Sequence, residues 1–181
     1  MSLTGYIAVE RFGPEKGDAW RKYLAWSGLH HLKQVITTDG CLCPHALKEL
    51  SPEDWKHNIQ RDLMIDYFRD LAYLLDRVEN MSNLNVLGSV HQPSGFFPHG
   101  FIDSRFEFAG YDLVDKGMSI SALLNCGGFP ESFSNSELNE SGLLTTFERA
   151  KKVQSDLFIN NPEETHADCD IQALWLYREN K

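Results

Sequence analysis

The side chains in this chain that are best suited to chemistry fall into three patterns, and the first is Cys41-Leu-Cys43-Pro-His45. Thiolates and imidazoles are the ligands that zinc prefers, and alternate residues of an extended loop can point to one side. A zinc finger usually separates its cysteines by two residues and repeats the pair, and this chain does neither. The pattern leaves two alternatives open, a zinc loop formed by Cys41, Cys43 and His45, or buried reduced cysteines.

The second pattern combines Cys126, which precedes Gly127-Gly128, with His166 and Asp168 near the end of the chain. If the strands that carry these residues pair, a thiol, an imidazole and a carboxylate would meet. A cysteine hydrolase uses this constellation to form a thiolate and to orient its base. The alternative is a glycine turn beside a buried thiol, because no family signature surrounds these residues.

The third pattern is acidic: Asp62, Asp66 and Asp70 recur at four-residue steps. On a helix this spacing places the three carboxylates on one face, where they repel one another unless solvent or a cationic partner neutralises them. The Pro- and Gly-rich segment 91–100 adds Phe96 and Phe97, which either pack over the core or form an exposed recognition tip. These five residues are the partner-binding residues that the sequence predicts.

Helix signals dominate the first half of the chain. Pro14 and Gly28 bracket one predicted helix. Ser51 caps a second, with Asp54 as its reciprocal partner, and apolar residues at three- and four-residue steps predict that it continues, straight or kinked, to about Glu79. A last helix is predicted from a cap at Thr145 to 161.

Strand signals dominate the second half. Alternating apolar residues predict strands at 84–90, at 106–113 with a bulge at Gly110, and at 118–124, and the last two form a hairpin. Residues 6–9 and 171–177 add short strands, the latter in a central position because both of its faces are apolar. The prediction is an α+β fold, with a mainly antiparallel sheet of about four to five strands packed against about three helices, in a single domain over 1–181.

Composition narrows the function classes. The chain has a formal net charge of −9, which repels a nucleic acid and attracts a basic protein. No apolar run is long enough to cross a membrane, and the first twelve residues do not follow the order of a secretory signal. Four cysteines are too few for a disulfide scaffold, so we expect a cytoplasmic protein with reduced thiols.

Five segments, in order along the chain, resemble those of an uncharacterised family of small bacterial proteins. They are Cys41-Leu-Cys43-Pro, Glu53-Asp54-Trp55, Gly110-Tyr111-Asp112-Leu113, Asn125-Cys126-Gly127-Gly128-Phe129-Pro130 and His166-Ala-Asp168-Cys169. The resemblance extends from about Trp20 to the end and implies no activity for any residue. Its general character is similar to that of small acidic bacterial antitoxins and immunity factors.

These observations together favour a non-enzymatic cytoplasmic binding protein of the immunity type, in which an acidic face occludes a basic protein partner. No cofactor, nucleic acid or membrane is expected, and the oligomeric state is left open. The alternative is a thiol-dependent or zinc-assisted enzyme centred on Cys126, His166 and Asp168.

Overall fold

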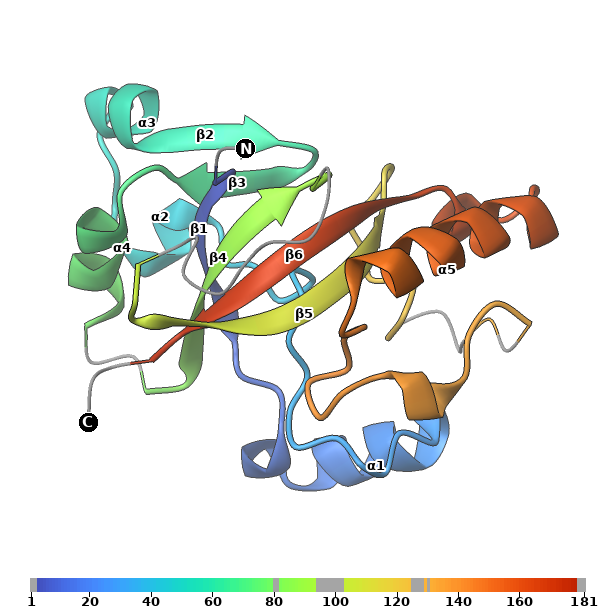
Figure 1. Cartoon of the computed structure of the whole chain (residues 1–181). Helices are drawn as coiled ribbons and strands as arrows, with labels where there is room; N and C mark the ends of the chain where they lie inside the picture. Colours follow the sequence, from blue (N-terminus) through green and yellow to red (C-terminus); the bar gives the residue numbers. More distant parts are fainter. Residues whose placement is uncertain (1–2, 80–81, 94–102, 125–128, 130, 179–181) are drawn as a thin grey trace.

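The computed structural model describes residues 3–79, 82–93, 103–124, 129 and 131–178 (Figure 1). Its strands are β1 (Gly5–Glu10), β2 (Ile59–Asp62), β3 (Ile65–Phe68), β4 (Leu84–His91), β5 (Phe106–Asp115) and β6 (Cys169–Tyr177). Its α-helices are α1 (Asp18–Ser27), α2 (Pro44–Leu47), α3 (Pro52–Asn58), α4 (Leu71–Val78) and α5 (Phe147–Asn160).

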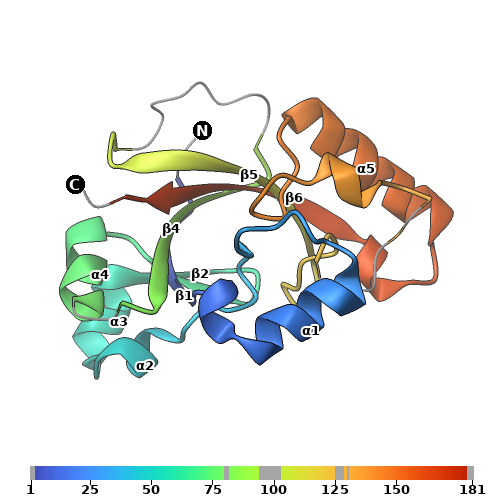
Figure 2. The same cartoon turned by 90° about the horizontal axis from the view of Figure 1, so that it is seen from below.

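The strands form one sheet in the order β2-β3-β1-β4-β6-β5, and every neighbouring pair is antiparallel. This confirms the predicted α+β class. The helices α2, α3 and α4 gather at the β1–β3 half, whereas α5 packs on β5 and β6 (Figure 2). The predicted central position of the last strand is also confirmed, because β6 pairs on both sides.

The long helix expected from Ser51 to about Glu79 is wrong. Its predicted capping box at Ser51 and Asp54 is present, but α3 ends at Asn58 and the chain then forms the β2–β3 hairpin before α4 begins. A four-residue spacing also fits the two-residue repeat of a strand, and β-branched and aromatic residues such as Ile59, Ile65 and Tyr67 favour strands. The hairpin supplies the two strands that the sequence analysis missed.

The predicted hairpin of residues 106–113 and 118–124 is partly right. A register shift between Phe108 and Gly110 confirms the bulge, and the chain reverses after Asp115. However, 118–124 forms no strand and keeps only an isolated bridge between Val114 and Ser121. The reason is that the Asp115 carboxylate accepts hydrogen bonds from backbone N–H groups inside the turn, and these hold a loop where a regular ladder would begin.

The two remaining predicted helices end close to their predicted places but begin later than expected. Gly28 ends α1 in the left-handed conformation, as predicted. The predicted start at Pro14 is wrong, because Pro14–Lys16 form a separate 3₁₀ helix and α1 begins at Asp18, after Gly17. The last helix is capped one residue later than expected, because the Thr146 hydroxyl, and not that of Thr145, accepts from the N–H of Arg149. Its buried stripe is Ala150, Val153 and Leu157, which fixes α5 against the apolar residues of β5 and β6.

Candidate functional site

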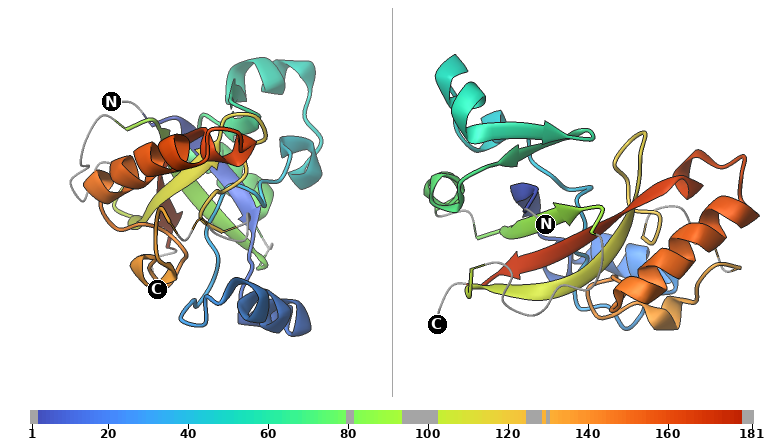
Figure 3. Two further views of the ribbon diagram at one scale, coloured as in Figure 1. Left: turned by 90° about the vertical axis from the view of Figure 1, so that its right-hand side faces the viewer. Right: turned by 45° about the horizontal axis from the view of Figure 1, so that its top comes forward.

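Two turns lie side by side at one end of the sheet, the β2–β3 turn and the turn that follows β5 (Figures 1 and 3). The backbone N–H of Met64 in the first donates to the Ser119 Oγ in the second at 3.3 Å. Each turn contains a residue other than glycine in a left-handed conformation, Leu63 at φ 52° and Ser119 at φ 59°. Such residues are uncommon outside glycine, and they tend to cluster at functional sites.

Between the turns lies a cavity of about 480 Å³, which we call the two-turn cavity. Met64 and Met118 stand on the two turns, and 65% and 64% of their surface is exposed. Among the described residues, the lining consists of Thr38, Asp39, Cys41, Met64, Ile65, Met118, Ser119, Ile120 and His166. These described residues combine apolar side chains with a carboxylate and include no lysine or arginine.

Asp39 is one of two aspartates that Ser121 joins beside this cavity. The Ser121 backbone N–H donates to Asp39 Oδ1 at 2.9 Å, and its hydroxyl donates to Asp112 Oδ1 at 2.6 Å. Asp39 reaches solvent, whereas Asp112 in β5 is fully buried and also accepts from the N–H of Leu113. The two carboxylates form a pair with one member inside the protein and one at the surface.

Both carboxyl groups of the pair have raised pKa values. Burial raises the pKa of Asp112 to about 7, and the negative charge of Asp39 adds to this effect. Partial burial likewise raises the pKa of Asp39, although hydrogen bonds from the Ser121 N–H and the Thr37 hydroxyl oppose the change. Asp112 is therefore partly protonated near neutral pH, which avoids a second full charge in the interior.

Three buried polar atoms near the pair have no hydrogen-bond partner among the described residues, namely Thr38 Oγ1, Asp112 Oδ2 and Gln172 Oε1. Asp112 and Gln172 are direct partners in the β5–β6 register, so they share one face of the sheet. Native proteins satisfy most buried polar groups, so each unmet group calls for an explanation.

His166 lines the cavity and contacts a further carboxylate. Its Nδ1 lies 3.0 Å from the Oδ2 of Asp115, which is buried. Although burial opposes the change, the N–H of Met118 and the His166 ring lower the pKa of Asp115. The other ring nitrogen of His166, Nε2, has no hydrogen bond to any described residue.

The predicted thiol, imidazole and carboxylate constellation is not what the described residues show. His166 contacts Asp115 instead of Asp168, whose carboxylate lies 2.5 Å from the ammonium group of Lys116. Because Asp115 is the last residue of β5 and is far from His166 in the sequence, only the fold brings it to the imidazole. Cys126 lies outside the described residues, so its proximity to His166 stays a prediction.

The three predicted acidic residues do not share a helix face. Asp62 contacts His91 Nδ1 at 2.8 Å, and Asp66 forms a two-point ion pair with Arg61. Asp70 caps α4 by accepting from a backbone N–H. Each carboxylate thus has a partner within the same molecule, because the segment is a hairpin followed by a helix cap and not a continuous helix.

A role for these aspartates in partner binding remains a prediction, without the common face that motivated it. Phe96 and Phe97 lie outside the described residues, so their role as anchors also stays a prediction. The cavity residues that the sequence analysis did not select as site residues are Asp39, Met64 and Met118. The available signal was Asp112, a lone carboxylate between the apolar residues Tyr111 and Leu113 of a predicted strand.

The cysteine-rich loop gives zinc little support. Cys41 is half-buried in the two-turn cavity and Cys43 is exposed, whereas the His45 side chain is outside the description. Burial raises the pKa of Cys41 to about 12, so in the free protein its sulfur is a protonated thiol. Within the described residues, no three histidine, cysteine, aspartate or glutamate side chains cluster as metal ligands.

These environments predict an order of thiol reactivity. We expect iodoacetamide at neutral pH to label Cys43 rapidly, because it is exposed, and to leave Cys41 and the buried Cys169 largely unmodified in the folded protein. Peptide mapping by mass spectrometry, with a denatured sample as the control, measures all of them separately. Fast labelling of Cys41 would contradict the protonated state assigned to it.

Comparisons of this chain with protein-family models, with curated proteins and with solved structures found no match. The resemblance noted in the sequence therefore remains an expectation, and the function must be argued from the site itself. No helix in the described part of the chain has the length and apolar character required to cross a bilayer.

Proposed function

We propose that this protein binds a basic protein partner through the surface around the two-turn cavity and acts by occluding it. The observation that carries the proposal is the pair of exposed methionines on either side of a cavity that holds Asp39. The proposal keeps the binding class that the sequence favours and moves the contact face from the three aspartates to the two turns.

Exposed methionines at a cavity are suited to binding. Methionine is flexible and polarisable, so it adapts to the shape of a partner, and it is frequent on adaptable binding surfaces. Met64 and Met118 lie on turns that are connected by the hydrogen bond from the Met64 N–H to the Ser119 hydroxyl. This bond keeps the two turns, and so the two methionines, close together. Apolar side chains that lose water at the centre of an interface supply most of its affinity.

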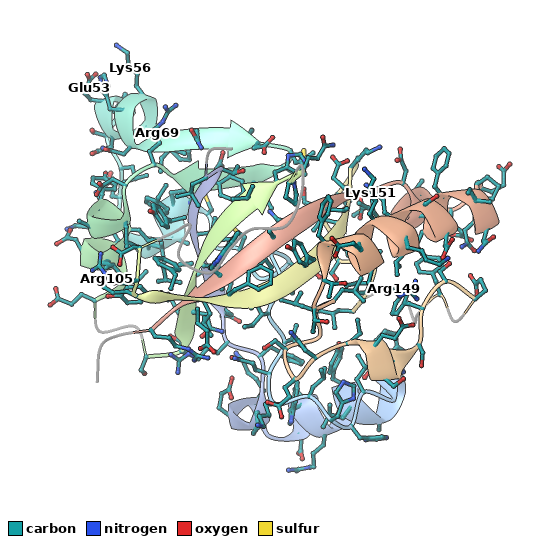
Figure 4. The ribbon with its side chains drawn as sticks, in the orientation of Figure 1. Glu53, Lys56, Arg69, Arg105, Arg149 and Lys151 are labelled. Atoms are coloured by element: carbon teal, nitrogen blue, oxygen red, sulfur yellow. The ribbon has the colours of Figure 1, made fainter. Side chains whose placement is uncertain are left out.

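The charge of the protein indicates the sign of the charge on its partner. The chain has a net charge of −9, and the described residues of the cavity lining include the Asp39 carboxylate but no lysine or arginine. Glu53, Lys56 and Arg69 lie at the opposite end of the β2–β3 hairpin from the turn (Figure 4). A cationic partner is therefore attracted to the molecule at long range and meets no lysine or arginine in this described lining.

A designed cationic peptide that alternates arginine with leucine tests this function. We expect calorimetry to detect binding that weakens several-fold between about 0.1 M and about 1 M salt. The double variant Met64→Ser/Met118→Ser is expected to weaken binding about tenfold or more through the loss of apolar contact. Ile159→Ser is the matched control, because Ile159 is 67% exposed on α5, outside the cavity lining.

Equal losses in the methionine and Ile159 variants would show nonspecific attraction and would contradict the proposed face. The same experiment includes the face predicted from the sequence, through charge reversal of Asp62, Asp66 and Asp70. We expect this triple variant to change the salt dependence less than Asp39→Lys, because its three carboxylates already have internal contacts. A larger effect of the triple variant would restore the original face.

One observation favours the alternative, an enzyme. The His166 and Asp115 pair at the cavity is the orienting half of a base and nucleophile system. Cys41 lines the same cavity, but its thiol interacts with the Leu42 carbonyl, and no hydrogen bond to His166 exists in the described residues. Within the described part of the chain, this site therefore shows no activated nucleophile, and rapid alkylation of Cys41 would be evidence for one.

A further inference from the structure

We infer that the two-turn cavity receives one arginine side chain of the partner, with the guanidinium group against Asp39 and Thr38 and the aliphatic stem between Met64 and Met118. The inference rests on the proposed function and adds the chemical class of the group that is recognised. It also explains a buried hydroxyl that the protein alone leaves without a partner.

The cavity offers hydrogen-bond acceptors. Asp39 uses Oδ1 for the Ser121 N–H and the Thr37 hydroxyl, and its Oδ2 has no hydrogen bond to any described residue. His166 also lines the cavity, and its Nε2 has no hydrogen bond to any described residue. A ligand that carries several N–H donors and a positive charge complements these atoms.

Thr38 provides the second, independent observation. It lines the cavity, only 2% of its surface is exposed, and its Oγ1 has no partner among the described residues. A buried hydroxyl without a hydrogen bond destabilises the protein that contains it. A donor from a bound ligand would remove this penalty, so the unmet hydroxyl contributes to affinity when the ligand arrives.

Arginine fits this combination better than lysine does. Its guanidinium group is planar, carries five N–H donors and is more weakly hydrated than an ammonium group, so burial beside a carboxylate is easier. Its three-carbon stem can lie along apolar surface while the charged end reaches an acceptor. The methionines and Ile65 supply the apolar surface, and Asp39 and Thr38 supply the acceptors.

Three peptides with one central residue between glycines test the inference: arginine, lysine, and citrulline, which has the shape of arginine without its charge. The readout is the chemical shift of the ¹³C-labelled methyl groups of Met64 and Met118, assigned with Met64→Leu and Met118→Leu. We expect the arginine peptide to shift both signals saturably, and the citrulline peptide to bind about tenfold or more weakly. The lysine peptide should fall between them.

Two variants separate recognition from folding. Thr38→Val keeps the shape but removes the unmet hydroxyl, so the free protein should unfold at a higher urea concentration while its affinity for the arginine peptide falls several-fold. Asp39→Asn should abolish the preference for arginine over citrulline. Thr145→Val is the control, because Thr145 is exposed outside the cavity, and it should change neither quantity.

The outcomes distinguish this inference from the proposed function. If the arginine, lysine and citrulline peptides shift the methionine signals equally, the surface binds peptides but the arginine pocket is wrong. An unchanged affinity of Thr38→Val for the arginine peptide would also overturn the pocket. If no peptide shifts these signals and the arginine and leucine peptide fails to bind as well, the proposed function is wrong.

Discussion

Asp112→Asn is expected to stabilise the protein at about pH 8 by up to about 4 kcal/mol, with little change near about pH 4. The pKa of Asp112 is about 7 in the folded protein because of burial and the charge of Asp39, whereas an unfolded chain restores an aspartate to about 4. Between these values the folded state retains a proton that the unfolded state has lost. Stability therefore falls as the pH rises, and the fall is complete above about pH 7.

Asparagine removes this dependence because its amide does not titrate. It retains an oxygen that can accept from the Ser121 hydroxyl and the Leu113 N–H, and its new N–H₂ lies on the same sheet face as the unpartnered Gln172 Oε1. Urea unfolding of both proteins across this pH range measures the difference. Asp156→Asn on α5, where the carboxylate is paired with Lys152, is the control. Parallel pH profiles for the wild type and Asp112→Asn would refute a raised pKa at Asp112.

Gly110→Ala is expected to lower the free energy of unfolding by about 3 kcal/mol or more. Gly110 has φ 144° at the β5 bulge, and an added Cβ would lie 2.6 Å from Leu143 Cβ and 2.8 Å from the Leu144 backbone oxygen. Neither neighbour can move easily, because Leu143 and Leu144 are fully buried. The variant therefore combines an unfavourable backbone conformation with a clash inside the core.

Gly17→Ala is the matched comparison, because Gly17 also has a positive φ, 56°, but no atom lies within 4 Å of an added Cβ. Its expected loss is about 2 kcal/mol, because residues with a Cβ rarely adopt its φ of 56° and ψ of −116°. Thermal or urea unfolding measures both variants. Similar losses for the two variants would mean that the bulge does not depend on the close approach of residues 143–144.

The contrast between these glycines shows what the sequence predicts well. The bulge at Gly110 follows from alternating residues that change phase at a glycine, which is local information. The capping box of α3 and the terminal glycine of α1 are also local, and both were predicted at the right residues. Strand order does not have such a local signature.

The β2–β3 hairpin shows why part of the fold could not be predicted. Its two-residue turn is Leu63-Met64, where glycine or asparagine normally supplies the positive φ, so the usual turn signal is missing. Without that signal, apolar residues at four-residue steps indicate a helix. The sequence analysis therefore places the exposed Met64 on a predicted helix and outside every predicted site.

The pairing of Asp39 with Asp112 depends on tertiary structure alone. Asp39 belongs to a loop and Asp112 to a strand, and they meet only because Ser121 follows a turn held by the Asp115 carboxylate. The sequence could identify Asp112 as unusual among apolar neighbours, but not its partner. The net charge of −9 favours the proposed class of function but does not indicate where a partner would bind.

The most direct test of the central claim is an intermolecular NOE experiment with the arginine peptide and protein labelled at its methionine methyl groups. If a cationic side chain enters between the two turns, the side-chain protons of the peptide arginine will show NOEs to the methyl groups of both Met64 and Met118. NOEs to neither methyl group at a saturating peptide concentration would contradict the claim.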